Sequence, residues 1–259
     1  MDIAVLVKQV PDTYAERRMD LSDWTLDREA SDAVIDEIDA KAVEVALQLT
    51  EKHGGEVTVV TMGPARATET LRKALSMGAH KAVHVLDDAI AGSCALQTSA
   101  VLAAALRQVG ADLVVAGNEA TDGRTGSVPA MIAERLGLPA ITSVRTLEVN
   151  GSTLTAQRVV ESGYSEITSP LPAVVSINEK IAEPRYPNFK GIMAAKSKPV
   201  TTLSAADLGL DPSTLGLAAA STQIVTGAPR PPKEAGTTVT DDGTGAQQIA
   251  DFMAGEHLL

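Results

Sequence analysis

Residues 113–127 read LVVAGNEATDGRTGS, a short apolar run followed at once by a glycine-rich turn. The run has the length and β-branched content of a buried strand. The turn opens the apolar stripe of a helix, marked by Ile132, Ala133 and Leu136. A strand, a tight turn and a helix in this order predict one βα unit of a parallel sheet.

Similar units fill the N-terminal half of the chain. Apolar runs at 3–7, 57–61 and 82–86 predict further buried strands, and apolar stripes within 42–49, 68–77 and 96–106 predict the helices between them. Connections of this kind place helices on both faces of the sheet. The fold class predicted is therefore α/β, with a doubly wound, mostly parallel, Rossmann-like sheet.

The pattern changes from Ile141. Runs at 144–149 and 153–160 flank Asn150-Gly151, which favours a β-hairpin with a primed turn, and a strand is predicted at 173–177. The segment 183–199 predicts a loop with a short helix. Beyond Thr201 only 247–253 has a helical pattern. We expect an α/β domain over 1–200 and an extended C-terminal arm over 201–259 that packs on a partner.

Composition excludes several classes of function. Lys and Arg number 22 against 33 Asp and Glu, so the net charge of −11 argues against nucleic acid as a partner. The single cysteine, Cys94, rules out an internal disulfide. The four histidines are scattered, and no metal site is predicted. No leader and no apolar run of membrane-spanning length is visible, so we expect a cytoplasmic protein, or a matrix protein in a eukaryote.

The turn at 117–127 is the strongest candidate for a ligand site. Its glycines allow close approach of the backbone, and free amides at the start of the next helix suit a phosphate. It lacks the Gly-Lys-Ser/Thr of a Walker A loop and does not follow the first strand as a Rossmann fingerprint does. A plain βα turn is the alternative. Met62-Gly63-Pro64 has the same position after another strand, and there an ordinary helix start is equally well supported.

Two further segments stand apart. Residues 10–35 form a long excursion after the first strand, where open α/β sheets bind ligands. Residues 178–193 place Tyr186 and Phe189 in a polar, proline-bounded loop. Phe189 is either folded back as a core residue or exposed as an apolar anchor for a partner.

Several motifs resemble those of electron transfer flavoprotein β subunits. They are PAVV at 172–175, EPRY at 183–186, IMAAK at 192–196, VKQVPD at 7–12, GP at 63–64 and ALSMGA at 74–79, together with 117–126. The resemblance runs from about residue 3 to residue 212, in family order. It implies an α/β domain of the adenine-nucleotide-binding type that pairs with an α subunit. It also implies that the α subunit carries most of a FAD site, while the β subunit usually binds AMP.

The resemblance also assigns residues by motif position. The nucleotide would contact Leu6, Asp36, Ile38, Met62, Gly117, Asn118, Asp122, Gly123, Arg124, Thr125, Gly126 and Ser127. Asp36-Glu37 stands where the family often has Asn-Pro. Thr13 or Tyr14 would lie near the flavin ring. The partner-recognition loop, about 183–198, would dock into acyl-CoA dehydrogenases through Glu183, Arg185, Tyr186, Phe189, Ile192 and Met193, with Phe189 as the anchor.

The function implied is an electron carrier with no catalytic residue of its own. The heterodimer would accept electrons from acyl-CoA and other dehydrogenases and pass them to a membrane quinone oxidoreductase. Bifurcating relatives bind a second FAD in place of AMP, but the loop here departs from their motif at Arg124 and Gly126 and is one residue shorter. A stand-alone nucleotide sensor of the universal-stress type and an adenylating enzyme are the rival hypotheses; the latter lacks a phosphate loop after the first strand.

Overall fold

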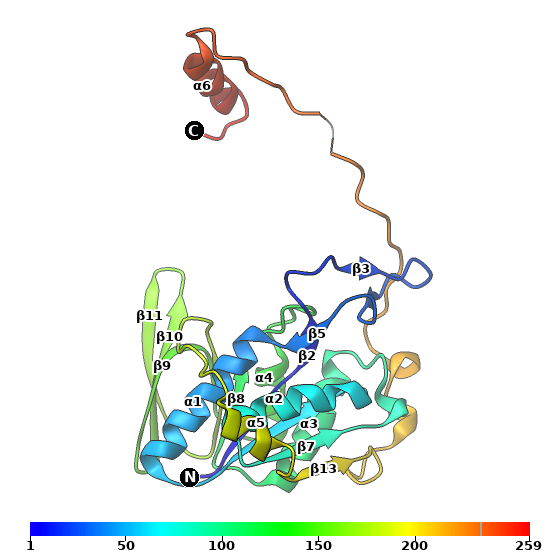
Figure 1. The fold of residues 1–259 in the computed structure, drawn as a ribbon, viewed down its shortest axis with the longest axis vertical. Helices are drawn as coiled ribbons and strands as arrows, with labels where there is room; N and C mark the ends of the chain where they lie inside the picture. The colour runs from blue at the N-terminus through cyan, green and yellow to red at the C-terminus, as the bar shows by residue number, and fades with distance from the viewer. Residues whose placement is uncertain (234) are drawn as a thin grey trace. The chain divides into compact units, whose positions relative to one another are not determined.

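The structure is a computed structural model that describes residues 1–233 and 235–259. They form two compact units, Met1–Ile224 and Val225–Leu259. The larger unit is built on a nine-stranded sheet with the order β11-β10-β9-β12-β8-β1-β6-β7-β13 (Figure 1). Its strands are β1 (Ile3–Leu6), β6 (Val57–Met62), β7 (Lys81–Val85), β8 (Leu113–Gly117), β9 (Ala140–Asn150), β10 (Thr153–Val160), β11 (Gly163–Pro170), β12 (Ala173–Ile177) and β13 (Val200–Leu203).

The predicted fold class is confirmed. In this sheet, every neighbouring pair from β9 to β13 in the spatial order is parallel. The strand β10 pairs antiparallel with both of its neighbours, β9 and β11. The predicted hairpin is present, and β11 extends it to three strands. Two strands of this sheet were not predicted: β11 and the edge strand β13, which pairs with β7 in the register Val200↔Ala82.

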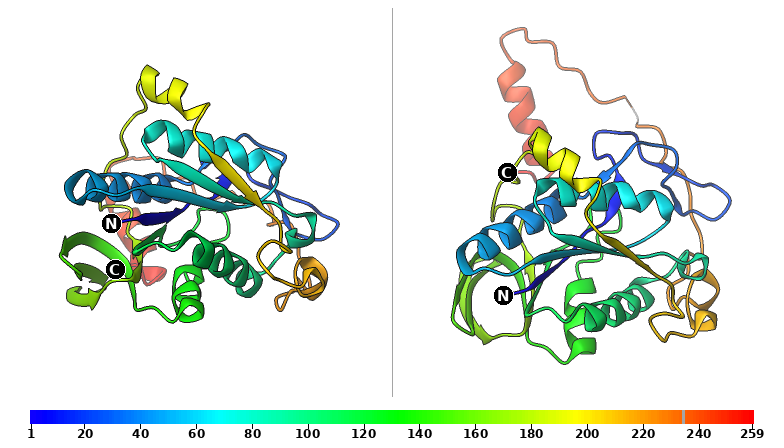
Figure 2. Two further views of the ribbon diagram at one scale, coloured as in Figure 1. Left: turned by 90° about the horizontal axis from the view of Figure 1, so that it is seen from below. Right: turned by 60° about the horizontal axis from the view of Figure 1, so that its bottom comes forward.

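Helices cover both faces of the sheet. The helix α1 (Glu37–His53) and α2 (Thr68–Met77) pack on the side of Ile3 and Val5, while α3 (Ala95–Val109) and α4 (Val128–Leu136) pack on the side of Ala4 and Leu6. Figure 2 shows this division, with the blue and cyan helices on one face and the green ones on the other. Alternate side chains of each central strand thus enter two cores made of Val, Leu, Ile and Ala.

The excursion after β1 forms two small ribbons. One pairs β2 (Gln9–Pro11) with β5 (Ala33–Ile35), and the other pairs β3 (Arg18–Met19) with β4 (Leu26–Asp27). Trp24 lies in the turn between β3 and β4, half-buried, with φ of 60°, and its amide donates to Asp20 O at 2.7 Å. The excursion is therefore an ordered ribbon with its own backbone hydrogen bonds.

The remaining helices are short. α5 (Phe189–Ala195) follows the strand β12, and α6 (Gly245–Gly255) lies in the smaller unit. Single 3₁₀ turns occur at η1 (Ala65–Ala67), η2 (Asp88–Ile90), η3 (Pro212–Thr214) and η4 (Leu217–Ala219). Within the described residues, none of the helices has both the length and the apolar character needed to span a bilayer.

Candidate functional site

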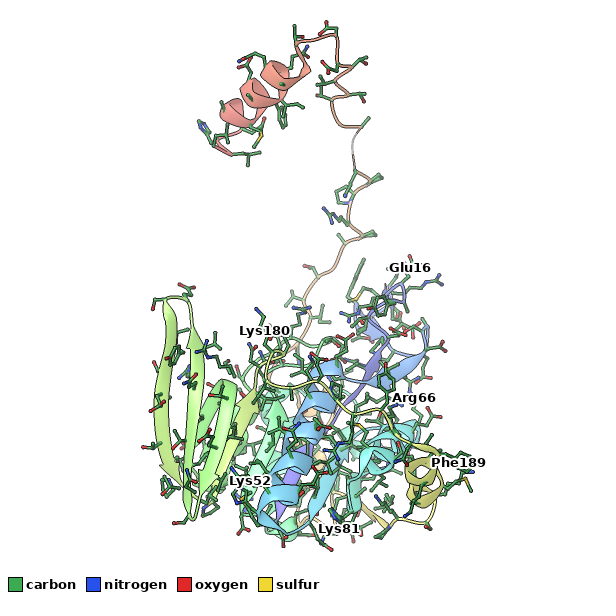
Figure 3. All side chains as sticks on the ribbon, turned by 60° about the vertical axis from the view of Figure 1, so that its left-hand side comes forward. Glu16, Lys52, Arg66, Lys81, Lys180 and Phe189 are labelled. Atoms are coloured by element: carbon green, nitrogen blue, oxygen red, sulfur yellow. The ribbon has the colours of Figure 1, made fainter. Side chains whose placement is uncertain are left out.

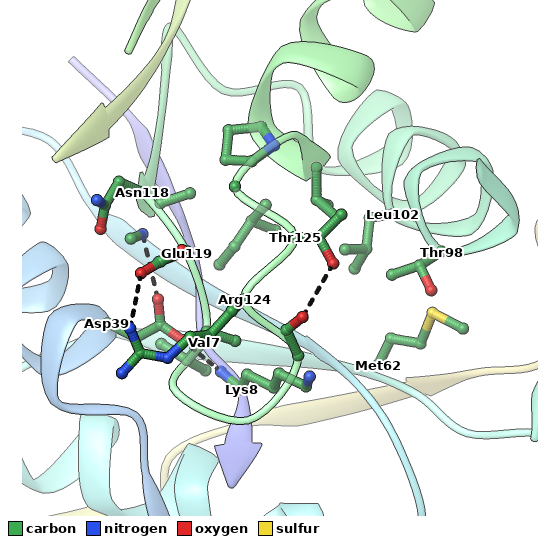
Figure 4. Close-up of a pocket in the computed structure, with 18 of the residues that line it drawn as sticks. Val7, Lys8, Asp39, Met62, Thr98, Leu102, Asn118, Glu119, Arg124 and Thr125 are labelled. Carbon is green, nitrogen blue, oxygen red and sulfur yellow. Dashed lines mark hydrogen bonds and ion pairs between the residues drawn. The ribbon is translucent and has the colours of Figure 1, made fainter. Parts of the chain in front are cut away.

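A pocket opens at the carboxyl ends of β1, β6 and β8 (Figure 4). In the sheet, β6 lies on one side of β1 and β8 on the other. The helix α1, which connects β1 to β6, packs on one face of the sheet, whereas α3 and α4, which flank β8 in sequence, pack on the opposite face. This is the switch point where open α/β sheets bind ligands. The pocket holds about 750 Å³, counting its open mouth.

Eight of the predicted nucleotide residues line this pocket: Leu6, Met62, Gly117, Asn118, Gly123, Arg124, Thr125 and Gly126. Glu119 and Ala120, within the predicted loop 117–127, also line it, and nine lining residues were not predicted: Val7, Lys8, Asp39, Val60, Thr98, Leu102, Ala116, Val128 and Pro129. Leu6, Val60, Met62 and Leu102 form an apolar wall, and polar groups come mainly from the loop between β8 and α4.

The last turn of that loop offers unused backbone donors. The amides of Thr125, Gly126 and Ser127 have no acceptor within the described part of the chain, whereas those of Thr121 and Gly123 donate to carboxylates. Ser127 is the N-cap of α4 without making a side-chain cap, and Pro129 lies in the first helical turn. Free amides at a helix start, backed by the helix dipole, form a site for an anion.

Asn118 supplies a second unused group. Its Oδ1 atom is buried and has no hydrogen-bond donor among the described residues, and the residue lines the pocket. A buried polar atom without a partner is uncommon in native proteins because its desolvation is costly. This oxygen is shielded from solvent, so it is an unsatisfied polar group within the pocket wall.

Asp39 ties the floor of the pocket together. Its carboxylate accepts hydrogen bonds from the amide of Lys8 after β1, at 2.8 Å, and from the amide of Gly117 at the end of β8, at 3.1 Å. Burial, together with repulsion from Asp36, raises the pKa of Asp39 well above its usual value, and the two amides oppose this shift. Its spacing from Ala42, Val43 and Ala46 places it on the buried stripe of α1, a signal the sequence analysis did not use.

Asp36 lies outside the pocket lining and accepts hydrogen bonds from the glycine-rich loop. It is the buried N-cap of α1, accepting from the amide of Ile38, and it also accepts from the amide and hydroxyl of Thr121 at 2.7 and 2.8 Å. Ile38 packs against the backbone of Gly117, where an added methyl carbon would lie 3.1 Å from it. Both residues shape the loop from outside the pocket.

Asp122 is committed to ion pairs. Its side chain is fully buried and contacts Lys8 Nζ at 2.7 Å and Arg28 at 3.0 Å. Burial alone would raise the pKa of Asp122, but Lys8 and Arg28 outweigh burial and hold it below its usual value. The ion pair between Arg28 and Asp122 links the glycine loop, residues 117–127, to the excursion after β1. A second link is the hydrogen bond that the Arg17 guanidinium donates to Thr121 O at 2.7 Å.

The two candidates for the flavin side lie on the excursion. Thr13 is exposed, and its hydroxyl donates to Glu37 Oε1 at 2.8 Å. Tyr14 is 96% exposed. Neither residue lines the pocket.

The partner-recognition loop splits into a fixed part and an exposed part. Arg185 donates from Nε to Glu44 Oε2 at 2.7 Å and from Nη1 to Glu51 Oε1 at 2.5 Å, while Glu183 pairs with Lys41 at 3.1 Å. Tyr186, Phe189, Ile192 and Met193 are exposed. Of the two alternatives for Phe189, the structure has the exposed one.

Comparison with known proteins matches residues 23–208 to the family described as "Electron transfer flavoprotein domain". The electron transfer flavoprotein subunit beta of Mycobacterium leprae is 52% identical over 264 aligned residues, which cover 100% of this chain and 99% of the relative. This chain belongs to the electron transfer flavoprotein β subunits. Membership decides against the stand-alone sensor and the adenylating enzyme.

Two further relatives are more distant and also align over nearly the whole chain. The electron transfer flavoprotein subunit beta of Thermoanaerobacterium thermosaccharolyticum is 38% identical, with 100% of both chains covered. The caffeyl-CoA reductase-Etf complex subunit CarD of Acetobacterium woodii is also 38% identical, over 98% of this chain and 96% of the relative. As an electron transfer flavoprotein β subunit, the chain is an electron carrier whose family implies an α-subunit partner.

Proposed function

We propose that this β subunit and its α subunit form a heterodimer that carries electrons from acyl-CoA and other dehydrogenases to a membrane quinone oxidoreductase. Family membership and the full-length similarity to β subunits support the proposal. The relative named as a subunit of a caffeyl-CoA reductase-Etf complex supports a link to CoA-dependent oxidoreductases. The relatives compared are bacterial, which supports a role in the cytoplasm.

A FAD held mostly by the α subunit would supply the redox chemistry. The part of this chain is to bind and orient. Thr13 and Tyr14 are exposed on the excursion, where they are free to face the flavin side of a partner. The excursion is braced against the glycine loop by Arg28 and Asp122, so a contact made there is held by an ordered ribbon.

The pocket at the switch point is proposed to bind AMP. The observation that carries this is the set of unused amides at Thr125–Ser127, at the start of α4. The amides fit a single phosphate, and the apolar wall of Leu6, Met62 and Leu102 fits an adenine ring. Of the two cations that line the pocket, Lys8 is paired with Asp122 at 2.7 Å and Arg124 with Glu119 at 3.5 Å.

The ligand content of the purified heterodimer tests this proposal. After denaturation and chromatography we expect one FAD and one AMP per heterodimer. Two FAD per heterodimer would favour the bifurcating alternative, and no adenine ligand beyond one FAD would contradict a nucleotide role for this pocket. The isolated β chain is expected to hold no redox-active flavin in stoichiometric amount.

A further inference from the structure

The helix α5 carries the exposed anchor residues but is too short to be stable alone. It has seven residues, whereas isolated helices shorter than about 12 residues are marginal in water. Its N-cap, Asn188, accepts from the amide of Gly191 at 2.8 Å, which satisfies one donor only. Figure 3 shows Phe189 at the outer side of this helix, and its side chain is 79% exposed. The order of α5 must therefore come from contacts with the body of the subunit.

Two cations join the carboxyl ends of α5 and α2 reciprocally. Arg72, on α2, donates from Nη1 to the carbonyl of Ala195 at 2.7 Å and to that of Lys198 at 2.9 Å. Lys198, just after α5, donates from Nζ to the carbonyls of Leu75 at 2.9 Å and Ala79 at 2.5 Å. At the end of each helix, carbonyls that lack an intrahelical partner thus accept hydrogen bonds from a cation of the other segment.

A backbone contact sets the distance between the two helices. An added methyl carbon at Gly191 would lie 2.5 Å from Ser76 O, so α5 rests directly on the last turn of α2. Ala195 is buried in the same contact, and burial lowers the pKa of the Lys198 ammonium. The face of α5 turned toward α2 is therefore fixed by small residues, and the larger apolar side chains are left on the outer face.

We propose that Arg72 and Lys198 are positioning residues that fix α5 on α2 before a dehydrogenase arrives, so that Phe189 is presented in its docking orientation. This rests on the proposed function and on the role of Phe189 as the dehydrogenase anchor that the family resemblance implies. A preformed anchor avoids the entropy cost of ordering the loop at the moment of binding. The ion pairs of Arg185 with Glu44 and Glu51 hold the start of the same loop on α1, so both ends of the segment are attached.

The test uses the FAD-containing heterodimer with Arg72→Gln and, separately, Lys198→Gln. Hydrogen exchange of the α5 amides is measured first, because it needs no dehydrogenase. We expect exchange across 189–198 to become at least about tenfold faster, since each variant loses charge-assisted bonds to two carbonyls. The heterodimer concentration giving half-maximal rate with an acyl-CoA dehydrogenase is expected to rise by about fivefold, with kcat and flavin content unchanged.

Lys73→Gln is the matched control. Lys73 lies next to Arg72 on α2, is exposed, and loses the same charge in the variant. Within the described residues its side chain makes none of the hydrogen bonds that join α2 to α5. In this variant we expect the amide exchange across 189–198 and the KM for the heterodimer to stay near those of the wild type. In the Phe189→Ala background, Arg72→Gln should add little to KM, because the group it positions is gone.

The outcomes separate the two ideas. Unchanged amide exchange in both Arg72→Gln and Lys198→Gln overturns the positioning role. The role is also overturned if these two variants exchange faster but keep the wild-type KM, while Phe189→Ala raises KM. If Arg72→Gln raises KM and Phe189→Ala does not, the positioning of α5 stands and the assignment of Phe189 as the anchor fails. If neither substitution changes KM, both are wrong.

Discussion

Asp39 is the residue on which the pocket floor depends. It accepts from amides at the ends of two strands, and the carboxylate is buried. Replacing it by alanine would leave both amides without an acceptor.

We expect Asp39→Ala to lower the free energy of unfolding of the heterodimer by about 2–4 kcal/mol and to remove bound AMP. Asp39→Asn keeps one accepting oxygen and should lose about half as much. Urea denaturation and nucleotide content measure the two effects. An alanine variant with wild-type stability would mean that Asp39 does not hold the strands together.

Asp122 provides a prediction on pH. Its pKa is held below its ordinary value of 3.8 by Lys8 and Arg28, against the effect of burial. The native chain therefore binds fewer protons than the unfolded chain just below pH 3.8. The contribution of the ion pairs is complete above that pH and is lost as the pH falls through the native pKa.

The comparison is between the wild type and Asp122→Asn. Near neutral pH we expect the wild type to be more stable by about 1–2 kcal/mol, because its partners Lys8 and Arg28 are partly exposed and solvent weakens the pairs. The difference should shrink only below pH 3.8. A difference that does not depend on pH would contradict the ion-pair assignment.

Phe189 is the residue with the clearest effect expected on function. We expect Phe189→Ala to slow electron transfer from acyl-CoA dehydrogenases by about tenfold at limiting heterodimer, with flavin content unchanged, as truncating an interface anchor does. Lys190→Ala, at the neighbouring exposed position, is the control. Loss of flavin, or an unchanged rate, would count against Phe189 as the anchor.

At the scale of elements, β8 and α1 meet without room for a side chain. A methyl carbon at Gly117 would lie 2.6 Å from Asp39 Oδ1, whereas one at Gly126 would have open space around it. Gly126 has φ of +66°, so there the cost of a side chain is in the backbone alone.

These two glycines make a matched pair. We expect Gly126→Ala to cost about 1 kcal/mol through its positive φ. Gly117→Ala should cost about 1–3 kcal/mol through overpacking, and it should also displace Asp39 and reduce AMP content. Thermal melting and ligand analysis of both variants make the comparison. Wild-type AMP content in Gly117→Ala would show that α1 does not control the loop.

The elements with strong patterns were predictable from sequence. The strand β8, its turn and α4 follow one another in residues 113–136, and the Asn150-Gly151 turn predicted the hairpin. β11 and β13 were missed because polar residues interrupt both, and their pairing with β10 and β7 depends on contacts made only in the fold. Local propensity carries little information at such sheet edges.

The site was predicted in part for a similar reason. Leu6, Met62 and much of the glycine loop follow strands and could be placed at one edge of the sheet. Thr98 and Leu102 come from α3, and their position against the loop depends on how that helix packs. Asp122 was predicted to contact the nucleotide, but it lies outside the pocket lining because Lys8 and Arg28, distant in sequence, bind it first.

At the scale of the whole molecule, the smaller unit has little core of its own. Its helix α6 exposes Ile249 and Phe252, while most of the buried side chains belong to residues 1–224. A helix with an apolar face and no core to cover it is typical of a segment that packs on a partner. We propose that this smaller unit packs on the α subunit; the arm predicted over 201–259 begins within the larger unit, because β13 belongs to the sheet.

Removing residues 225–259 tests that role. We expect the shortened chain to keep its far-UV circular dichroism and its melting behaviour when alone, because the larger unit contains the whole sheet. Its affinity for the α subunit should fall by about tenfold or more, measured by titration. Ile249→Asp with Phe252→Asp in the full chain should do the same. Wild-type affinity in both would contradict the role of the arm.

Trp24 is the only tryptophan in the sequence, and it lies in the turn between β3 and β4. The intrinsic fluorescence of this subunit at 295 nm excitation therefore reports on one small ribbon of the excursion. A denaturation curve of the isolated subunit recorded in this way would miss the sheet if the ribbon loosened first. The subunit thus carries a natural local optical probe beside the residues proposed to face the flavin.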